Sequence, residues 1–266
     1  DLSKLMAGSF GTLGVMHTVT LKVMPNDETS ATVIVACSDP RAAGKAMTIA
    51  MGSENEVSAA AWIAPEDAPH LDVPLAGEYG SGLVAVRVEG PKPSVAWRAD
   101  ALCRALAGFG ECHEVPESHS HSIWKVVANV APFVASENTG SVLWRVSVPP
   151  ASGGDICAQL IEKTGGRAMM DWAGGLIWLQ IAASDAANAP DAPDAMAGTI
   201  RDIVANVGGQ ANLVRASDEI LQATSVFHPE DPALARINAR IKENLDPKGI
   251  LNPGRIAPVS LNGEGA

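Results

Sequence analysis

Short apolar segments that alternate with single helices constrain the fold of this chain more than any other sequence feature. Residues 31–36 (A-T-V-I-V-A) are rich in β-branched and apolar residues, which favours a buried strand. Asp39 is placed to cap a helix that begins at Pro40 and runs to about Met51. Residues 58–63 form the expected returning strand. The order strand, helix, strand predicts a sheet that is covered by helices.

The same order follows directly downstream. Residues 83–89 alternate as a strand, residues 94–106 are expected to be helical, and residues 111–115 form a second returning strand. Two consecutive units of similar length predict a duplicated, ferredoxin-like arrangement on one antiparallel sheet, although no sequence identity links them. The fold class is therefore expected to be α+β.

The rest of the chain continues the mixture of helices and strands. Alternation of Val19, Leu21 and Val23 with polar residues predicts a half-buried strand at 16–23, and Pro25 with the polar residues after it marks a domain boundary. Residues 184–195 and the tail from Pro258 are expected to be a mobile loop and a disordered end. The other expected elements are helices at 123–131, 154–164, 197–206 and 232–245, strands at 141–148 and 212–215, and a hairpin of 167–172 with 176–182.

Charge and composition exclude several classes of protein. The chain has 19 basic and 30 acidic residues, a formal charge of −11, and no basic run. It therefore lacks the footprint of a nucleic-acid-binding protein and the polybasic segment of a membrane-surface protein. No apolar stretch is long enough to span a bilayer. The chain starts at Asp1 without Met or a signal peptide, which indicates that its natural N-terminus lies further upstream.

The chain contains four cysteines. Cys37, Cys103, Cys112 and Cys157 include no C-x-x-C pair, and their spacing fits neither a zinc site nor an iron–sulfur site. They are too few for a disulfide scaffold. We therefore expect all four to be small buried residues in a reducing cytoplasm.

A glycine-rich segment at 8–15 (G-S-F-G-T-L-G-V) is the strongest candidate for ligand contact. Its glycines permit positive φ and let the backbone approach a flat ligand closely. It lacks the Lys-Ser/Thr of a phosphate-binding loop and no helix is expected after it, so neither a Walker nor a Rossmann loop is predicted. Taken alone, the segment is equally compatible with a tight turn before a strand.

Two motifs together carry a family resemblance. Residues 5–15 (L-M-A-G-S-F-G-T-L-G-V) and 19–25 (V-T-L-K-V-M-P) resemble the final signature of the FAD-binding domain in flavoproteins of the vanillyl-alcohol-oxidase type. Residues 245–255 (L-D-P-K-G-I-L-N-P-G-R) are similar to the C-terminal motif of FAD-linked oxidases. Prolines and glycines in this motif end a helix and form a turn that orients Arg255. The two motifs in this order, about 240 residues apart, are more specific than either alone.

Further segments narrow the resemblance to the FAD-binding subunits of glycolate oxidases. They are residues 143–145 (L-W-R), residues 171–178 with Asp171-Trp172 and Trp178, Gly208-Gly209, and residues 226–229 (V-F-H-P). The resemblance implies the C-terminal remnant of a PCMH-type FAD-binding domain at 1–25 and a ferredoxin-like cap or substrate domain at 26–245. It also implies that the closing turn and tail at 246–266 return towards the flavin.

The resemblance also implies which residues contact FAD. The pyrophosphate-binding part of the flavin domain lies N-terminal to this region in the family, so weak or absent FAD binding is expected of this chain alone. The candidate cofactor-binding residues are Gly8, Ser9, Gly11, Thr12, Gly14, Val15 and Asn252.

A 2-hydroxy acid needs a cation for its carboxylate and a base for its hydroxyl proton, with the flavin as hydride acceptor. Arg145 and Arg255 are the candidate cations, because a guanidinium can make two parallel hydrogen bonds to a carboxylate. His228 is the candidate base. A structural role stays open for each: Arg145 could point to the surface or be paired, and His228 could stabilise the fold.

Other residues are assigned structural roles. His119 and His121 lie in a polar, loop-like stretch without an obvious third ligand, so no metal site is predicted. Trp144 and Trp172 are expected to pack in the core rather than line a substrate site.

The resemblance implies a component of an FAD-dependent 2-hydroxy-acid oxidoreductase that takes hydride from glycolate and passes electrons to a partner. A second flavin subunit and an iron–sulfur subunit are the implied partners. The expected location is the cytoplasm, with membrane association only through the complex. Two alternatives stay open: a non-catalytic scaffold subunit of the same complex, and a D-lactate-type dehydrogenase.

Overall fold

The contacts of the chain divide it into two units. The computed structural model describes residues 1–68, 71, 81–134, 140–182 and 192–256. Unit 1 comprises residues 1–25 and 226–266, and unit 2 comprises residues 26–225. The division after Pro25 coincides with the expected boundary. Residues 226–245, which we expected within the cap, group instead with the two ends of the chain.

Unit 2 is built on one eight-stranded antiparallel sheet in the order β4-β1-β3-β2-β6-β7-β5-β8. Its strands are β1 (Thr29–Ala36), β2 (Val57–Ile63), β3 (Leu83–Gly90), β4 (Cys112–Val115), β5 (Val142–Ser147), β6 (Arg167–Asp171), β7 (Leu176–Ile181) and β8 (Gln210–Arg215). The expected α+β class with an antiparallel, helix-covered sheet is confirmed.

The sheet consists of two ferredoxin-like halves joined edge to edge. The first half has the strand order β4-β1-β3-β2, and the second repeats this order from the other side as β6-β7-β5-β8. The halves meet where β2 pairs with β6, at Trp62 and Met170. The two β-α-β units predicted as a duplication form only the first half. A second complete set follows in residues 142–215, which the sequence pattern did not identify as a repeat.

Four helices cover one face of this sheet: α2 (Pro40–Met51), α4 (Lys92–Leu106), α7 (Gly153–Thr164) and α9 (Ala192–Ala205). Asp39 caps α2 by accepting hydrogen bonds from the amides of Arg41 and Ala42. The opposite face carries α5 (Glu117–Ala128) and α6 (Ala131–Val134), which bury Ile123 and Phe133 in a second cluster. Helix α5 contacts β1, in the first half of the sheet. On the same face, the second half of the sheet includes partly buried polar residues.

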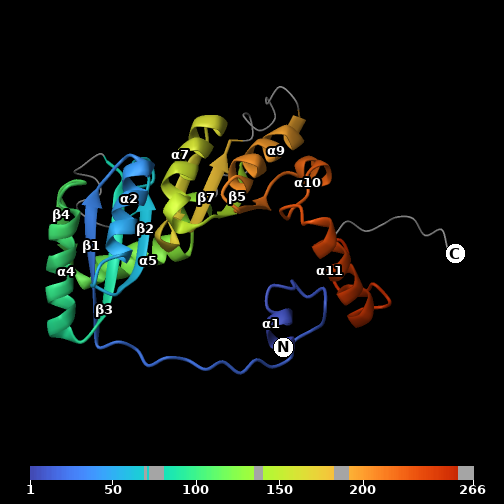
Figure 1. The fold of residues 1–266 in the computed structure, drawn as a ribbon, viewed down its shortest axis with the longest axis horizontal. Coiled ribbons are helices and arrows are strands. Elements are labelled where there is room, and N and C mark those ends of the chain that lie inside the picture. The colour runs from blue at the N-terminus through green and yellow to red at the C-terminus, as the bar shows by residue number, and fades with distance from the viewer. Residues whose placement is uncertain (69–70, 72–80, 135–139, 183–191, 257–266) are drawn as a thin grey trace. The chain divides into compact units, whose positions relative to one another are not determined.

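Helices α2 and α7 lie side by side across the junction of the two halves (Figure 1). Two glycines allow this close approach. A Cβ atom on Gly44 would lie 2.7 Å from the Cα of Gly154, and one on Gly154 would lie 2.7 Å from the carbonyl oxygen of Pro40. Contact between helix backbones therefore joins the two halves on the helical face, as strand pairing joins them in the sheet.

The strand predicted at 16–23 is absent. These residues form no regular element, and Val19, Leu21 and Val23 are 60%, 76% and 78% exposed. Alternation predicts which side chains a strand would bury, but a strand also needs a hydrogen-bonding neighbour, and none of the described strands pairs with this segment. In the described residues, no helix is long and apolar enough to cross a bilayer.

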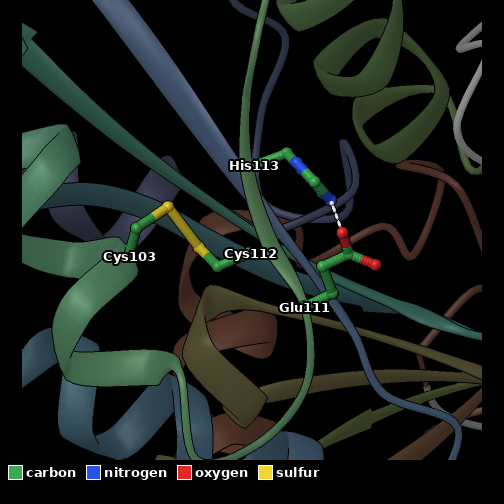
Figure 2. The surroundings of a disulfide bond; sticks show 4 residues. All are labelled: Cys103, Glu111, Cys112 and His113. Carbon is green, nitrogen blue, oxygen red and sulfur yellow. Dashed lines mark ion pairs between the residues drawn. A yellow bond between two sulfur atoms is a disulfide. The ribbon is translucent and has the colours of Figure 1, made fainter.

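Two of the four cysteines form a disulfide, which corrects the prediction that all four are reduced (Figure 2). Cys103 near the end of α4 and Cys112 at the start of β4 have Cα atoms 5.3 Å apart, within the range a disulfide bridges. The turn between them reverses the chain and brings together cysteines nine residues apart. Cys37 and Cys157 are free and buried as predicted, and burial raises the pKa of Cys157 to about 12.

His119 and His121 lie in α5 and not in a loop, so that prediction was wrong. The helix begins at Glu117, directly after Pro116, and buries Ser120, Ile123 and Val127. The first turn contains only polar residues, so the apolar spacing that indicates a helix is missing there. Residues 184–191 of the predicted mobile loop and the tail from Pro258 lie outside the described residues.

Candidate functional site

In unit 1 the glycine-rich segment and the C-terminal motif form one structure. The side-chain amide of Asn252 donates a hydrogen bond of 2.6 Å to the carbonyl of Phe10. Lys242, on α11 (Pro232–Leu245), donates from Nζ to the carbonyl of Thr12 at 2.7 Å and to that of Leu251 at 2.9 Å. The two motifs that carried the family resemblance are therefore in direct contact, although 230 or more residues separate the bonded groups.

Lys242 is held in place by Asp246, whose side chain is buried. Their Nζ and Oδ2 atoms are 2.5 Å apart, and the backbone amides of Ile250 and Leu251 donate to the same carboxylate. The hydrogen bond from Lys242 holds the pKa of Asp246 below its usual value. Sequence reasoning identified the Asp-Pro turn but missed Lys242. The available signal was its position four residues before Asp246, on the same face of the helix.

Acidification is expected to break the hydrogen bonds that the Asp246 carboxylate accepts from Lys242, Ile250 and Leu251. Because the pKa of Asp246 is lower in the folded chain, its charged form contributes stability above its usual pKa of 3.8, and the contribution disappears as the pH falls through the lower folded value. Hydrogen-exchange protection of the Ile250 and Leu251 amides should therefore fall as the pH is lowered below about 4. Protection in β5 at the same pH values is the internal control.

The same protection should already be low at pH 7 in the Asp246→Asn variant. Full protection of both amides in this variant would contradict the assigned role of the carboxylate.

The glycine-rich segment presents bare backbone to its surroundings. Gly8 and Gly11 have φ values of +80° and +72°, and both are exposed. A Cβ atom on Gly8 would meet no atom within 4 Å, and one on Gly11 would meet only the Asn252 amide at 4.0 Å. Ser9 and Thr12 are instead buried, and the Thr12 hydroxyl donates to the Ser9 carbonyl at 2.7 Å. The buried pair fixes the turn that exposes the two glycines.

This geometry fits one wall of a flavin site. A flat ring can approach backbone that carries no side chain, and the open space beside Gly8 and Gly11 leaves room for it. Val15 is 85% exposed and Gly14 is partly buried beside Met6. Asn252 supports the segment through its hydrogen bond to the Phe10 carbonyl, and its contact with the cofactor stays a prediction.

Arg255 and His228 also belong to unit 1. The Arg255 guanidinium lies 5.5 Å from the centre of the Phe10 ring, which packs edge-to-face with Phe227 at 5.3 Å. His228 follows Phe227 and is half-buried, whereas Arg255 is exposed. The structure therefore gathers all of the predicted site residues except Arg145 in this unit.

Arg145 lies in unit 2, on β5. It points away from the helical cluster, because its neighbours Trp144 and Val146 face that cluster. Its guanidinium lies 5.2 Å from the centre of the Trp172 ring. The guanidinium makes no hydrogen bond and no ion pair to any described residue. A partly buried guanidinium without an anionic partner is unusual, because its donors lose water without compensation.

The two tryptophans differ from each other. Trp144 is buried in the core, as predicted, where Arg201 lies 5.5 Å from its ring centre. Trp172 is 56% exposed, so the prediction of core packing was wrong for this residue. It follows directly on β6 and its ring lies beside Arg145, where it could contact a ligand. In the described part of the chain, no three His, Cys, Asp or Glu side chains come together in a metal-binding arrangement.

Comparison with known proteins agrees with this geometry. No family model matches the chain. The glycolate oxidase subunit GlcE of Escherichia coli (strain K12) is 28% identical over 259 residues, which are 96% of this chain and 57% of that protein. The family resemblance is confirmed. The chain spans little more than half the length of this relative.

Several solved structures have a related fold. p-Cresol methylhydroxylase with bound substrate has a TM-score of 0.58 at 14% identity, with 88% of this chain and 54% of that one covered. 4-Ethylphenol oxidase from Gulosibacter chungangensis has a TM-score of 0.56 at 16% identity, with coverages of 90% and 56%. Alkyldihydroxyacetonephosphate synthase has a TM-score of 0.58 at 15% identity, with coverages of 95% and 49%. At these identities the likeness concerns the fold alone.

Proposed function

We propose that this chain is part of an FAD-dependent 2-hydroxy-acid oxidoreductase, a glycolate oxidase subunit that works with a second flavin subunit and an iron–sulfur subunit in the cytoplasm. The observation that carries the proposal is the partly buried Arg145 guanidinium, which has no hydrogen bond or ion pair among the described residues. The similarity to a glycolate oxidase subunit along nearly the whole chain supports it.

Each residue has a defined task in this proposal. Arg145 binds the substrate carboxylate through two parallel hydrogen bonds, which replace the contacts its donors lack. Exposed Arg255 is a second cation for an anionic group near the glycine-rich segment, and His228 is a candidate base. When bound, FAD supplies the hydride acceptor, and the backbone at Gly8 and Gly11 lines its ring.

Reconstitution of the full-length subunit with its partners tests the proposal. The complex should reduce an artificial electron acceptor when glycolate is added, and omission of this subunit should abolish the activity. D-Lactate in a parallel assay distinguishes a D-lactate-type dehydrogenase. Activity that is lost without this subunit but is fully restored by its Arg145→Gln variant would leave only the assembly role.

The chain alone is expected to bind FAD weakly or not at all. Its residues fit one wall of a flavin site, and the described glycine-rich segment is not followed by a helix whose N-terminus could hold the pyrophosphate. The purified 266-residue chain should therefore be colourless. Flavin absorbance at stoichiometric occupancy after dialysis would contradict this expectation.

A non-catalytic assembly subunit is the second candidate. It is favoured by unit 1, whose described residues contribute no apolar side chain to the buried core. Helix α11 alone exposes Leu234, Ile237 and Leu245 by 57%, 53% and 42%. Apolar surface of this kind is typical of segments that pack against further polypeptide. The reconstitution assay separates this role from catalysis.

A further inference from the structure

Asp171 lies on the same face of the sheet as Arg145. It is the last residue of β6, and Met169, two residues earlier, belongs to the cluster on the face opposite the four helices. Arg145 pairs across the strands with Trp178, which pairs with Met169. Arg145 and Asp171 therefore emerge on one face, two strands apart and offset by two residues along the strand, which separates their Cα atoms by about 12 Å.

The turn after Asp171 connects these two residues. Trp172 and Ala173 have φ values of 52° and 55°, a left-handed conformation that is unfavourable for residues with a side chain. Oδ1 of Asp171 accepts a hydrogen bond of 2.7 Å from the Trp172 amide. The turn places the exposed Trp172 ring beside Arg145. Strained backbone thus holds the ring beside the Arg145 guanidinium, and the Asp171 carboxyl group accepts from the amide of the same residue.

Close packing fixes this turn in place. A Cβ atom on Gly153, at the start of α7, would lie 2.1 Å from the carbonyl oxygen of Gly174. One on Gly174 would lie 2.9 Å from the carbonyl oxygen of Pro150. The backbone of the turn is therefore in contact with the start of α7 and cannot relax without moving the helix.

The Asp171 carboxyl group has one oxygen available. Oδ2 makes no hydrogen bond to any described residue, and Asp171 is partly buried. Burial raises its pKa, and the nearby Arg87 opposes this increase. Arg87 is on β3, paired with Glu89 at 3.2 Å, and it lies over the Trp124 ring. A partly desolvated carboxylate with a free oxygen is a better proton acceptor than a fully hydrated one.

We infer that Asp171 accepts the hydroxyl proton of a small 2-hydroxy acid whose carboxylate is bound by Arg145, with Trp172 as one wall of the site. The inference rests on the proposed function and replaces His228 as the base. The O–H proton passes to Oδ2 of Asp171 as the C–H bond at the same carbon breaks. When bound in the complete enzyme, FAD would supply the acceptor for the hydride and its two electrons, and the product would be a 2-oxo acid.

The positions of Asp171 and Arg145 suit this substrate. The carboxylate and hydroxyl of a 2-hydroxy acid are on adjacent carbons, so their two protein partners must belong to one local arrangement. Asp171 and Arg145 share one face of one sheet and both contact Trp172.

Binding of glycolate and acetate to the 266-residue chain tests the inference without flavin. The two anions share a carboxylate and differ in the hydroxyl group. With ¹⁵N-labelled tryptophan, the indole resonance that disappears in Trp172→Phe should shift on titration with either anion. Glycolate should bind about tenfold more tightly than acetate, because its hydroxyl donates to a charged oxygen.

Two variants assign the contacts. Arg145→Gln should abolish the shift for both anions. Asp171→Asn, which keeps an acceptor for the Trp172 amide, should reduce the preference for glycolate to about twofold or less and leave acetate binding unchanged. Asp155→Asn, the same change at an exposed residue of α7, is the matched control and should behave as wild type.

The outcomes separate the inference from the function on which it rests. Equal affinity of the wild-type chain for both anions overturns the role of Asp171 and leaves carboxylate binding by Arg145 intact. A preference that survives in a folded Asp171→Asn variant does the same. If neither anion shifts the Trp172 resonance, both Arg145 as the carboxylate site and the inference fail. The wild-type comparison requires no variant to fold.

Discussion

Replacement of Gly44 by leucine is expected to destabilise unit 2 by about 3 kcal/mol or more. A Cβ atom at this position would lie 2.7 Å and 2.9 Å from the backbone Cα and N atoms of Gly154. No flexible side chain can move aside there, so α2 and α7 must separate, and each is anchored to its half of the sheet. Urea unfolding followed by circular dichroism should show a lower midpoint, or no folded baseline.

Gly198→Ala is the control for this substitution. Gly198 is also in a helix, α9, but a Cβ atom there meets nothing within 4 Å. Alanine should stabilise the chain by about 0.5–1 kcal/mol, since it restricts the unfolded chain and favours the helix. An unfolding midpoint for Gly44→Leu equal to that of the wild type would show that the two helices do not need their close contact.

Replacement of Arg145 by glutamine in the full-length reconstituted enzyme is expected to lower kcat/KM for glycolate by about 100-fold or more. Removal of one partner from a desolvated charge pair costs roughly 2–5 kcal/mol, and each 1.4 kcal/mol is about a factor of ten. Arg145→Lys should recover only part of the activity, because an ammonium cannot make the two parallel hydrogen bonds of a guanidinium. Initial rates over a range of glycolate concentrations measure both variants.

Arg41→Gln provides the matched control. Arg41 lies on α2, on the helical side of the sheet, and pairs with Glu162 at 2.9 Å. Its loss should leave kcat/KM within about twofold of the wild type, since exposed ion pairs contribute little. If Arg145→Gln is as active as Arg41→Gln, Arg145 does not bind the substrate carboxylate.

The sequence predicts best those helices whose first and last residues are determined by signals close by in the sequence. Helix α2 spans residues 40–51 and α11 spans residues 232–245, as expected, because an aspartate cap and a proline in the first turn are local signals. The strand at 16–23 failed because alternation carries no information about a partner strand. The disulfide was missed because a turn, and not the spacing alone, brings Cys103 to Cys112.

The candidate site was predictable in its residue types and not in its arrangement. The two end motifs indicated a contact that the structure contains, through Asn252 and Phe10. Arg145 was identified on its strand, but its lack of a partner depends on side chains from other strands. Trp172 is exposed because it and Ala173 adopt the left-handed conformation. Glycine or asparagine would have indicated this conformation in the sequence, but neither residue type stands at these two positions. Lys242 was signalled only by its position four residues before Asp246, and its contacts with the Thr12 and Leu251 carbonyls could not be predicted from the residue types.

The pairing of the first and last segments sets the order in which this chain can assemble. Residues 26–225 contain all the strands of their sheet and can fold as soon as they leave the ribosome. The carbonyls of Phe10 and Thr12 are synthesised 230 or more residues before their donors on Lys242 and Asn252. During this interval the glycine-rich segment has no access to these partners. The exposed apolar residues beside it can then form non-native contacts. A chaperone that binds these residues would therefore be most useful during this interval.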